Sequence, residues 1–192
     1  MSRVGNVTGR TRGVGEAISI MLKDNGYTVS ATYTGNDKAA AAFSKANGIN
    51  VYRFNVGDFD ACETSIAQIT ADLGPIEVLV NNAGITRDGN MNRMERDKWD
   101  AVINTNLGSC FNMSRLVIES MRSEGFGRIV NIGSINDQAG QYGQVNYATQ
   151  NLVSMNSLKR WLKKRWQKAL QSMQLRQATL PLKWFVLFLQ RF

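Results

Sequence analysis

Residues 1–150 alternate short apolar runs with longer amphipathic stretches, an alternation that predicts parallel strands separated by helices. The expected strands are the mostly apolar runs Arg3 to Thr8, Tyr27 to Tyr33, Ile49 to Asn55, Ile76 to Asn81 and Arg128 to Ile132. The expected helices are the amphipathic stretches Gly13 to Asn25, Asp37 to Ala46, Asp60 to Leu73 and Asp97 to Ser123. This pattern predicts an α/β fold, a Rossmann-like doubly wound parallel sheet that is truncated after its fifth strand.

The net charge of +8 is distributed very unevenly along the chain. Residues 1–150 carry 14 Lys and Arg against 15 Asp and Glu, whereas residues 151–192 carry nine Lys and Arg and no acid. A basic total normally indicates an anionic partner, but here it belongs wholly to the tail. We therefore expect one domain over residues 1–150, followed by a basic tail over 151–192, and no nucleic-acid partner.

Composition excludes several kinds of chemistry. The chain has no histidine, which removes Ser-His-Asp and Cys-His catalysis together with the commonest zinc ligand. Its two cysteines, Cys62 and Cys110, lie far apart in predicted helices, so we expect neither a disulfide framework nor a metal site. No signal-peptide pattern and no apolar run of membrane-spanning length occurs. A cytoplasmic protein without membrane contact is the expectation.

The first predicted strand leads into a glycine-rich loop, Thr8 to Gly15, and then directly into a helix. Glycines here would let the backbone approach a pyrophosphate at the helix N-terminus, whose free amides favour an anion. The spacing Gly-x-x-x-Gly-x-Gly resembles that of the short-chain dehydrogenase/reductase family. The resemblance implies cofactor contacts from Gly9, Arg12, Gly13, Val14 and Gly15.

The end of the second strand bears on the choice of nicotinamide cofactor, because an acid there would bind the adenosine 2′-hydroxyl. The residues around Thr34 include no acid, and Arg12 in the glycine loop can pair with a 2′-phosphate. We therefore expect NADP(H) rather than NAD. The family also contacts adenine at positions matching Asn55, Val56 and Asp58, although an Asp after a strand is as often a helix N-cap.

The resemblance becomes specific at an Asn-Asn-Ala-Gly sequence that closes the fourth strand, where Asn82, Ala83 and Gly84 would lie beside the cofactor. It continues through three residues whose types and order match the family's catalytic positions. These would be the water-holding Asn106, the substrate-binding Ser134 and the proton-donating Tyr147. The resemblance extends over residues 1–148.

Hydride addition to a ketone builds negative charge on its oxygen, so the reaction needs a hydrogen-bond donor and a proton. In the resembled family a lysine four residues after the tyrosine lowers the tyrosine pKa and binds the nicotinamide ribose. Asn151 occupies that position here. Because an amide carries no charge, the chain as written is expected to be inactive.

The expected substrate follows from the sequences around these residues, above all residues 140–147, which resemble acetoacetyl-CoA reductases. On that resemblance Asp88, Gln141, Tyr142 and Gln144 line the acyl pocket, with a solvent-exposed polar loop as the alternative. The implied reaction is reduction of acetoacetyl-CoA to 3-hydroxybutyryl-CoA, which feeds polyhydroxyalkanoate synthesis. The related 3-oxoacyl-carrier-protein reductases are the main rival, and family members are usually homotetramers.

The tail allows two interpretations. Apolar residues from Leu152 to Met173 recur at helical spacing among basic ones, as in an amphipathic helix that binds a membrane or an acidic partner. The second interpretation comes from the genetic code. Codons can be chosen for residues 152–160 that, when translated from the third base of the first codon, encode Gly-Ile-His-Glu-Phe-Thr-Lys-Ala, and the resembled family continues with this kind of sequence. In that frame the tail encodes an apolar sixth strand and a Pro-Gly turn, and a lysine follows Tyr147 by four places. We interpret the tail as out-of-frame translation after loss of one base between Tyr147 and Gln150.

Overall fold

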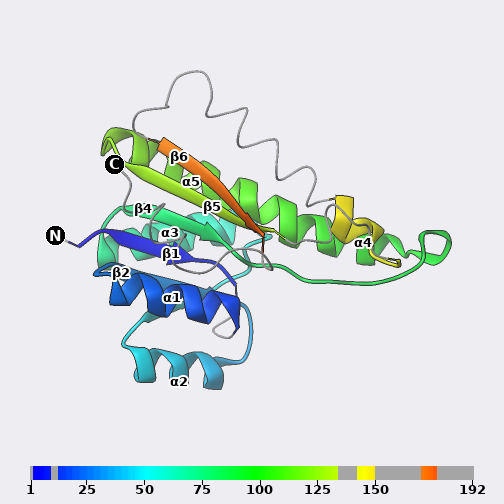
Figure 1. Cartoon of the computed structure of the whole chain (residues 1–192), viewed down its shortest axis with the longest axis horizontal. Coiled ribbons are helices and arrows are strands. Elements are labelled where there is room, and N and C mark those ends of the chain that lie inside the picture. Colours follow the sequence, from blue (N-terminus) through cyan, green and yellow to red (C-terminus); the bar gives the residue numbers. More distant parts are fainter. Residues whose placement is uncertain (1, 10–12, 134–141, 150–169, 177–192) are drawn as a thin grey trace.

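The structure, a computed structural model, describes residues 2–9, 13–133, 142–149 and 170–176 (Figure 1). Its centre is a six-stranded sheet in the order β3-β2-β1-β4-β5-β6, in which every described strand pair is parallel. The strands are β1 (Val4–Val7), β2 (Thr28–Tyr33), β3 (Asn50–Arg53), β4 (Ile76–Asn81), β5 (Gly127–Gly133) and β6 (Leu170–Arg176). The strand order reverses between β1 and β4, which is where doubly wound sheets form a ligand crevice.

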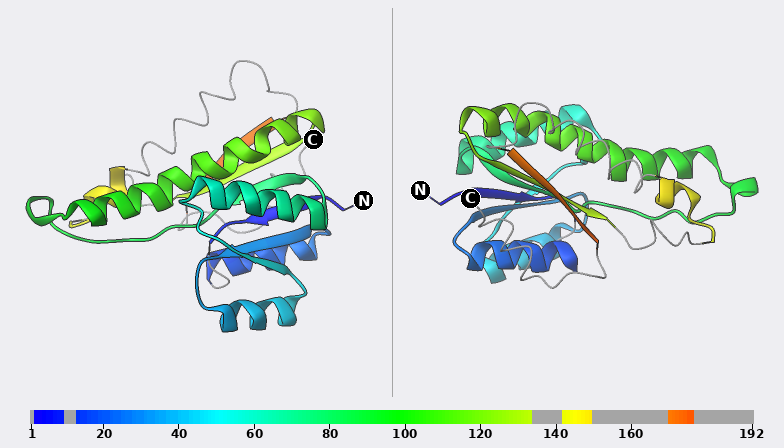
Figure 2. Two further views of the ribbon diagram at one scale, coloured as in Figure 1. Left: turned by 180° about the vertical axis from the view of Figure 1, so that it is seen from behind. Right: turned by 45° about the horizontal axis from the view of Figure 1, so that its top comes forward.

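Helices cover both faces of this sheet. They are α1 (Val14–Asp24), α2 (Asp37–Asn47), α3 (Phe59–Leu73), the 3₁₀ turn η1 (Met91–Arg93), α4 (Arg96–Val102), the π-helical turn η2 (Ile103–Gly108) and α5 (Ser109–Ser123). Figures 1 and 2 show α1 and α2 on one side of the sheet and α3 and α5 on the other. Each side has its own buried cluster, with Leu22 and Phe43 in one and Ile69 and Met113 in the other. The prediction of a Rossmann-like parallel sheet is confirmed.

Two residues that interrupt the apolar pattern of β1 have structural explanations. All four residues of β1 are buried. A Cβ at Gly5 would lie 3.4 Å from Leu22 Cδ1, so the glycine lets α1 pack closely on the strand. Asn6 is fully buried and its Nδ2 donates to Ser30 Oγ on β2 at 2.8 Å. The neighbouring strand therefore satisfies the amide nitrogen of Asn6, whereas its buried Oδ1 has no hydrogen-bond partner among the described residues.

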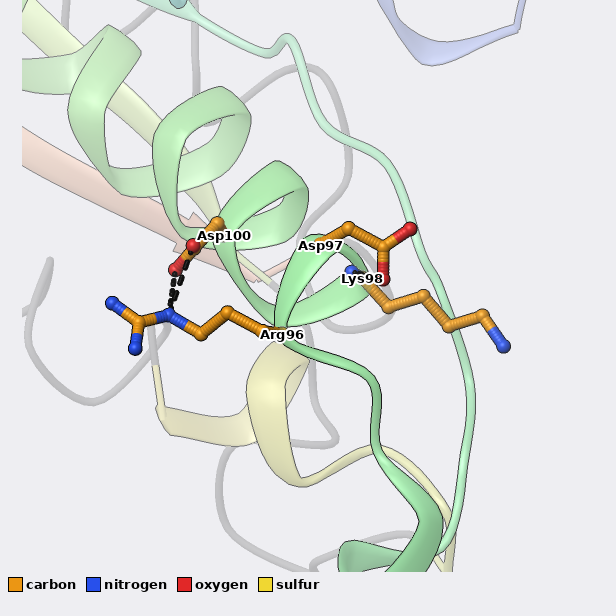
Figure 3. A network of polar contacts seen from close by, with 4 residues as sticks. All are labelled: Arg96, Asp97, Lys98 and Asp100. Atoms are coloured by element: carbon orange, nitrogen blue, oxygen red, sulfur yellow. Dashed lines mark hydrogen bonds and ion pairs between the residues drawn. The ribbon is translucent and has the colours of Figure 1, made fainter.

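The single long helix expected from Asp97 to Ser123 is interrupted by the π-helical turn η2. Its first segment, α4, carries an Arg96 to Asp100 ion pair of 3.0 Å, four residues apart (Figure 3). Lys98 points to the other side of α4 in that view and pairs with Glu95 at 3.0 Å. Each such exposed pair contributes only about 0.3–0.5 kcal/mol, so they help order the start of the helix without determining the fold.

The expectation that the sheet ends after its fifth strand is corrected by β6. Residues 170–176 pair with β5 along its whole length, from Gly127 opposite Leu170 to Gly133 opposite Arg176. Leu170 and Met173, which fit the helical spacing of the tail, therefore lie in a strand. The physical reason is that an open edge presents unpaired backbone N–H and C=O groups, which an extended segment can satisfy with little regard to its side chains.

Candidate active site at the carboxyl edge of the sheet

The predicted glycine loop lies at the end of β1 and leads into α1. Gly9 has a φ of +91°, and a Cβ there would lie 2.7 Å from Ala83 Cα, so only glycine fits at this close approach. Gly13 is the N-cap of α1 with a φ of +64° and no side-chain cap, and Val14 and Gly15 form the first turn. The first amides of α1 are thus not capped by a side chain, which suits an anionic ligand. Arg12 lies outside the described residues.

Thr8 joins the ends of β1 and β4. Its Oγ1 accepts hydrogen bonds from Asn82 N at 3.0 Å and Ala83 N at 3.1 Å, and Asn82 Nδ2 donates to the Thr8 carbonyl at 3.0 Å. Thr8 is fully buried, so its hydroxyl oxygen replaces solvent for both amides. These contacts bring the glycine loop and the Asn82 to Gly84 segment together at the reversal of strand order.

The residues that directly follow β2 are uncharged. Thr34 is exposed and follows the strand, and the side chain of Asn36 caps α2 by accepting from Ala39 N at 3.0 Å. The nearest acid along the chain, Asp37, is bound by Arg53 Nη1 at 3.0 Å. This ion pair is exposed on both sides, so it contributes little to stability.

The three predicted adenine-side residues follow β3. Val56 is buried, and Asn55 Oδ1 accepts from Gly57 N at 3.0 Å. Asp58 Oδ1 accepts from Ala61 N at 3.1 Å, which makes it the N-cap of α3. Asp58 therefore acts as a helix N-cap in the structure. The same hydrogen bond anchors the loop that contains Asn55 and Val56.

Asn106 lies in the π-helical turn η2 and holds the loop that follows β4. Its Oδ1 accepts from Ile85 N at 2.8 Å and its Nδ2 donates to Ile85 O at 2.9 Å. The side chain is buried, and a Cβ at Gly84 would lie 3.6 Å from Asn106 Oδ1. Single π turns occur frequently at functional sites. Here the turn brings an amide side chain within hydrogen-bond distance of the residue next to Gly84.

Tyr147 lies in a helical segment, residues 145–149, and is partly buried. The preceding Asn146 is fully buried, and its Nδ2 donates to Arg87 O at 3.0 Å while its Oδ1 accepts from Tyr147 N at 2.8 Å. Asn146 therefore ties the backbone of the predicted proton donor to the loop after β4. Ser134 and Gln141 lie outside the described residues.

A cleft of about 550 Å³ opens beside this segment. Its described lining comes from two stretches far apart in sequence, namely Gly89, Asn90, Met91, Asn92, Tyr142, Gly143, Gln144, Val145 and Ala148. The stretches are joined by Gly89 N donating to Gly143 O at 2.8 Å and by Gln144 Nε2 donating to Asp88 Oδ2 at 3.1 Å. Tyr142 and Gln144 thus line this cleft, whereas Asp88 is not among its lining residues and contacts it through Gln144.

Sequence reasoning did not single out four residues that organise this edge. They are Thr8, Asn81, Asn131 and Asn146. Asn81 Nδ2 donates to Asn131 Oδ1 at 2.9 Å across the paired strands β4 and β5, both side chains being buried. For Asn81 and Asn131 the available signal was a polar side chain in a strand whose other residues are mostly apolar, since buried polar groups need partners.

Among the residues that the structure describes, no group of three or more His, Cys, Asp or Glu side chains is arranged to hold a metal ion. None of the helices seen there is long and apolar enough to cross a membrane.

Comparison with known proteins identifies the family. Residues 3–166 match the family model described as short chain dehydrogenase. The chain is 57% identical to an acetoacetyl-CoA reductase of Shinella zoogloeoides over 77% of its own length and 61% of that protein. It is 42% identical to a 3-oxoacyl-[acyl-carrier-protein] reductase of Vibrio harveyi, over 76% of its length and 60% of that protein.

A crystal structure of a short-chain dehydrogenase from Streptomyces avermitilis superposes with a TM-score of 0.85 at 22% identity, covering 92% of this chain and 65% of that one. This likeness shows the fold. The chain spans about 61% of the length of the acetoacetyl-CoA reductase that it matches. From the family match over residues 3–166, we conclude that the chain belongs to the short chain dehydrogenase family.

Proposed function

We propose that residues 1–150 derive from an NADPH-dependent reductase that converts acetoacetyl-CoA to 3-hydroxybutyryl-CoA, the step that supplies polyhydroxyalkanoate synthesis. The observation that carries this choice is the difference in identity between relatives. It is 57% to an acetoacetyl-CoA reductase and 42% to a carrier-protein reductase, over nearly equal shares of this chain. Contacts of Gly9, Thr8 and Asn106 hold together the loops at the carboxyl edge of the sheet, where a nicotinamide cofactor would bind.

The roles of the chain's own residues follow from the charge that develops on the substrate. NADPH, when bound, would supply a hydride to the 3-keto carbon, and the Tyr147 hydroxyl would donate the proton to the oxygen on which negative charge develops. Ser134 would donate a hydrogen bond to the same oxygen. Asn106 holds the loop after β4 through Ile85, and this loop would form a wall of the site in which the nicotinamide would lie.

NADP(H) is the proposed cofactor. The support is that no acid directly follows β2, whose next residues are Thr34, Gly35 and Asn36, together with the position of Arg12 in the glycine loop. Gly9, Gly13, Val14 and Gly15 would hold the pyrophosphate, with Thr34, Asn55, Val56 and Asp58 on the adenosine side. Asn82, Ala83 and Gly84 would lie along the nicotinamide half.

The rival carrier is acyl carrier protein, since a reductase acting on that substrate is 42% identical to this chain. The test uses a frame-corrected protein, defined as the chain encoded after one base is restored between codons 147 and 150. NADPH oxidation is followed with acetoacetyl-CoA and with the acetoacetyl carrier-protein thioester. We expect a higher kcat/KM with the CoA thioester, and a higher value with the carrier protein would replace this proposal by its rival.

We further propose that residues 151–192 are out-of-frame translation. The bounds of β6 support this origin, because residues 170–176 in the other frame can be encoded as Ile-Thr-Val-Asn-Ala-Ile-Ala, directly before a Pro-Gly turn. The strand in the structure thus coincides with the apolar strand of the alternative translation. Resequencing the DNA across codons 147–151 tests the proposal. A clean reading with no lost base would leave the basic tail as a genuine segment and favour a binding role for it.

The family resemblance also carries two proposals about the whole protein, namely a cytoplasmic location and a homotetramer. The segment proposed to take part in subunit contacts is α4 to α5, which extends past the carboxyl edge of the sheet in Figures 1 and 2. Analytical ultracentrifugation of the frame-corrected protein tests the assembly, and a monomer at micromolar concentration would contradict it.

A further inference from the structure

One backbone carbonyl in the loop after β3, residues 55–58, is bound by side chains from two helices. Asn112 of α5 donates from Nδ2 to Val56 O at 3.1 Å, and Cys62 of α3 donates from Sγ to the same oxygen at 3.4 Å. Val56 and both donors are buried, so these side chains replace water at the carbonyl. A thiol is a weak donor, whereas an amide N–H is a strong one. Most of the hydrogen bonding to Val56 O therefore comes from Asn112.

The same loop lies against the π-helical turn. A Cβ at Gly57 would lie 3.5 Å from Asn104 O, so the backbone of the loop closely approaches the backbone of η2. The other contacts of the loop are local, since Gly57 N donates to Asn55 Oδ1 and Asp58 caps the helix that follows. Asn112 differs from these residues because it comes from α5, 56 positions after Val56 in the sequence.

Asn112 follows Asn106 by six positions on the continuous helix formed by η2 and α5. Asn106 holds the loop after β4 through Ile85, and Asn112 holds the loop after β3 through Val56. Figures 1 and 2 show α5 on the same face of the sheet as α3, which packs against it. In the proposed function these two loops serve the two halves of the cofactor. One helix therefore contacts the loop of each half through a buried amide side chain.

We propose that Asn112 is a positioning residue for the adenosine half of the cofactor. By donating to Val56 O it holds residues 55–58 in the conformation that receives the adenosine, although it does not touch the ligand itself. A loop held in place before binding does not have to be ordered by the ligand, and affinity rises accordingly. Without the amide, the Asp58 cap and the weak Cys62 contact would remain, so the loop would stay folded but less firmly placed. This inference rests on the nicotinamide cofactor of the proposed function.

Two fragments of the cofactor test the proposal without any reduction. The fragment 2′,5′-ADP carries the adenosine and its 2′-phosphate, and ADP-ribose carries the adenosine without that phosphate. Calorimetry on the 192-residue chain measures the affinity of each. Asn112→Leu keeps the size of the side chain and removes its N–H donors, so it should weaken both fragments about fivefold, the size of one lost hydrogen bond. Asn112→Gln retains an amide donor and should bind more nearly as the unchanged protein does.

Ser114→Ala is the matched control. Ser114 is also a buried polar residue of α5, but its Oγ accepts from Asn81 Nδ2 at 3.4 Å on β4 and has no part in the loop after β3. This change should alter the affinity for either fragment less than about twofold. Equal weakening by Asn112→Leu and Ser114→Ala would show a general effect of α5 packing and would overturn the proposal.

Steady-state kinetics of the frame-corrected protein separates positioning from a general loss of structure. Asn112→Leu should raise the KM for NADPH about fivefold and change kcat less than about twofold, because the reacting half of the cofactor lies at the other loop. A fall in kcat with an unchanged KM would contradict the proposal, as would fragment affinities that Asn112→Leu leaves unchanged.

The fragments also distinguish this inference from the proposed function. If the unchanged chain binds them and Asn112→Leu does not weaken them, the role of Asn112 is refuted while the cofactor proposal stands. If only ADP-ribose binds and Asn112→Leu weakens it, the role of Asn112 is supported and the choice of NADP is refuted. Failure of the unchanged chain to bind either fragment would refute both.

Discussion

Asn106 forms two hydrogen bonds with the backbone of Ile85, accepting from its N–H at 2.8 Å and donating to its carbonyl at 2.9 Å. The amide lies in the π-helical turn η2 and the backbone in the loop after β4, so these bonds connect the two sides of the candidate active site. Both Ile85 groups would lose their partner if the side chain were removed.

We expect Asn106→Ala in the 192-residue chain to lower the free energy of unfolding by about 1–3 kcal/mol, the usual cost of leaving buried backbone groups unpaired. Urea unfolding monitored by circular dichroism measures it. The matched control is Asn104→Ala, since Asn104 belongs to the same turn but is exposed. Equal losses for the two variants would show that these hydrogen bonds do not stabilise the loop.

The sequence predicts the elements whose hydrophobic pattern is strong. The bounds of β4 are as expected, because a continuous apolar run ends in the polar Asn81. The π turn that interrupts the helix before Ser109 carries no such signal, since its residues fit an α-helical pattern equally well. The burial of Asn146 is likewise invisible in sequence, because it depends on Arg87, 59 positions earlier. The strand β6 depends on an open edge of the sheet, which no local pattern specifies.

Thr8 offers a second test of the candidate site. Thr8→Val keeps the shape of the side chain and removes the oxygen that accepts from Asn82 N and Ala83 N. Two amides beside the proposed nicotinamide site would then lack a partner, so NADPH binding by the frame-corrected protein should weaken at least about tenfold, or 1.4 kcal/mol. Thr8→Ser retains the hydroxyl and should bind nearly as well. Similar affinity of the Val and Ser variants, measured by NADPH fluorescence titration, would contradict the role given to this oxygen.

Cofactor preference tests the interpretation of the end of β2. We predict that the frame-corrected protein uses NADPH at least about tenfold more efficiently than NADH, which corresponds to about 1.4 kcal/mol. Arg12→Ala should remove much of this preference by raising the KM for NADPH. The measurement is kcat/KM with each cofactor. Equal efficiencies, or a ratio that Arg12→Ala leaves unchanged, would show that the cofactor assignment is mistaken.

The two thiols are expected to react slowly while the protein is folded. Burial, with a smaller contribution from Asp58, raises the pKa of Cys62 to about 11, and burial raises the pKa of Cys110 to about 12. Since the thiolate is the reactive form and both values lie above pH 8, little thiolate is present at that pH. Modification by a disulfide reagent at pH 8 should be slow in buffer and fast in urea. Rapid modification of the native protein would contradict this burial.

Reductase activity with and without the basic tail shows whether residues 151–192 have replaced a segment that catalysis needs. NADPH oxidation with acetoacetyl-CoA should be compared for the 192-residue chain and the frame-corrected protein. In the first, the uncharged Asn151 stands where the resembled family has a lysine, so the site lacks the cation that assists proton transfer from Tyr147, and general acid catalysis of this kind is worth about a hundredfold to ten-thousandfold in rate. We predict turnover by the frame-corrected protein and at least about a hundredfold less by the 192-residue chain. Comparable turnover by the two proteins, or none with the frame-corrected one, would contradict the account.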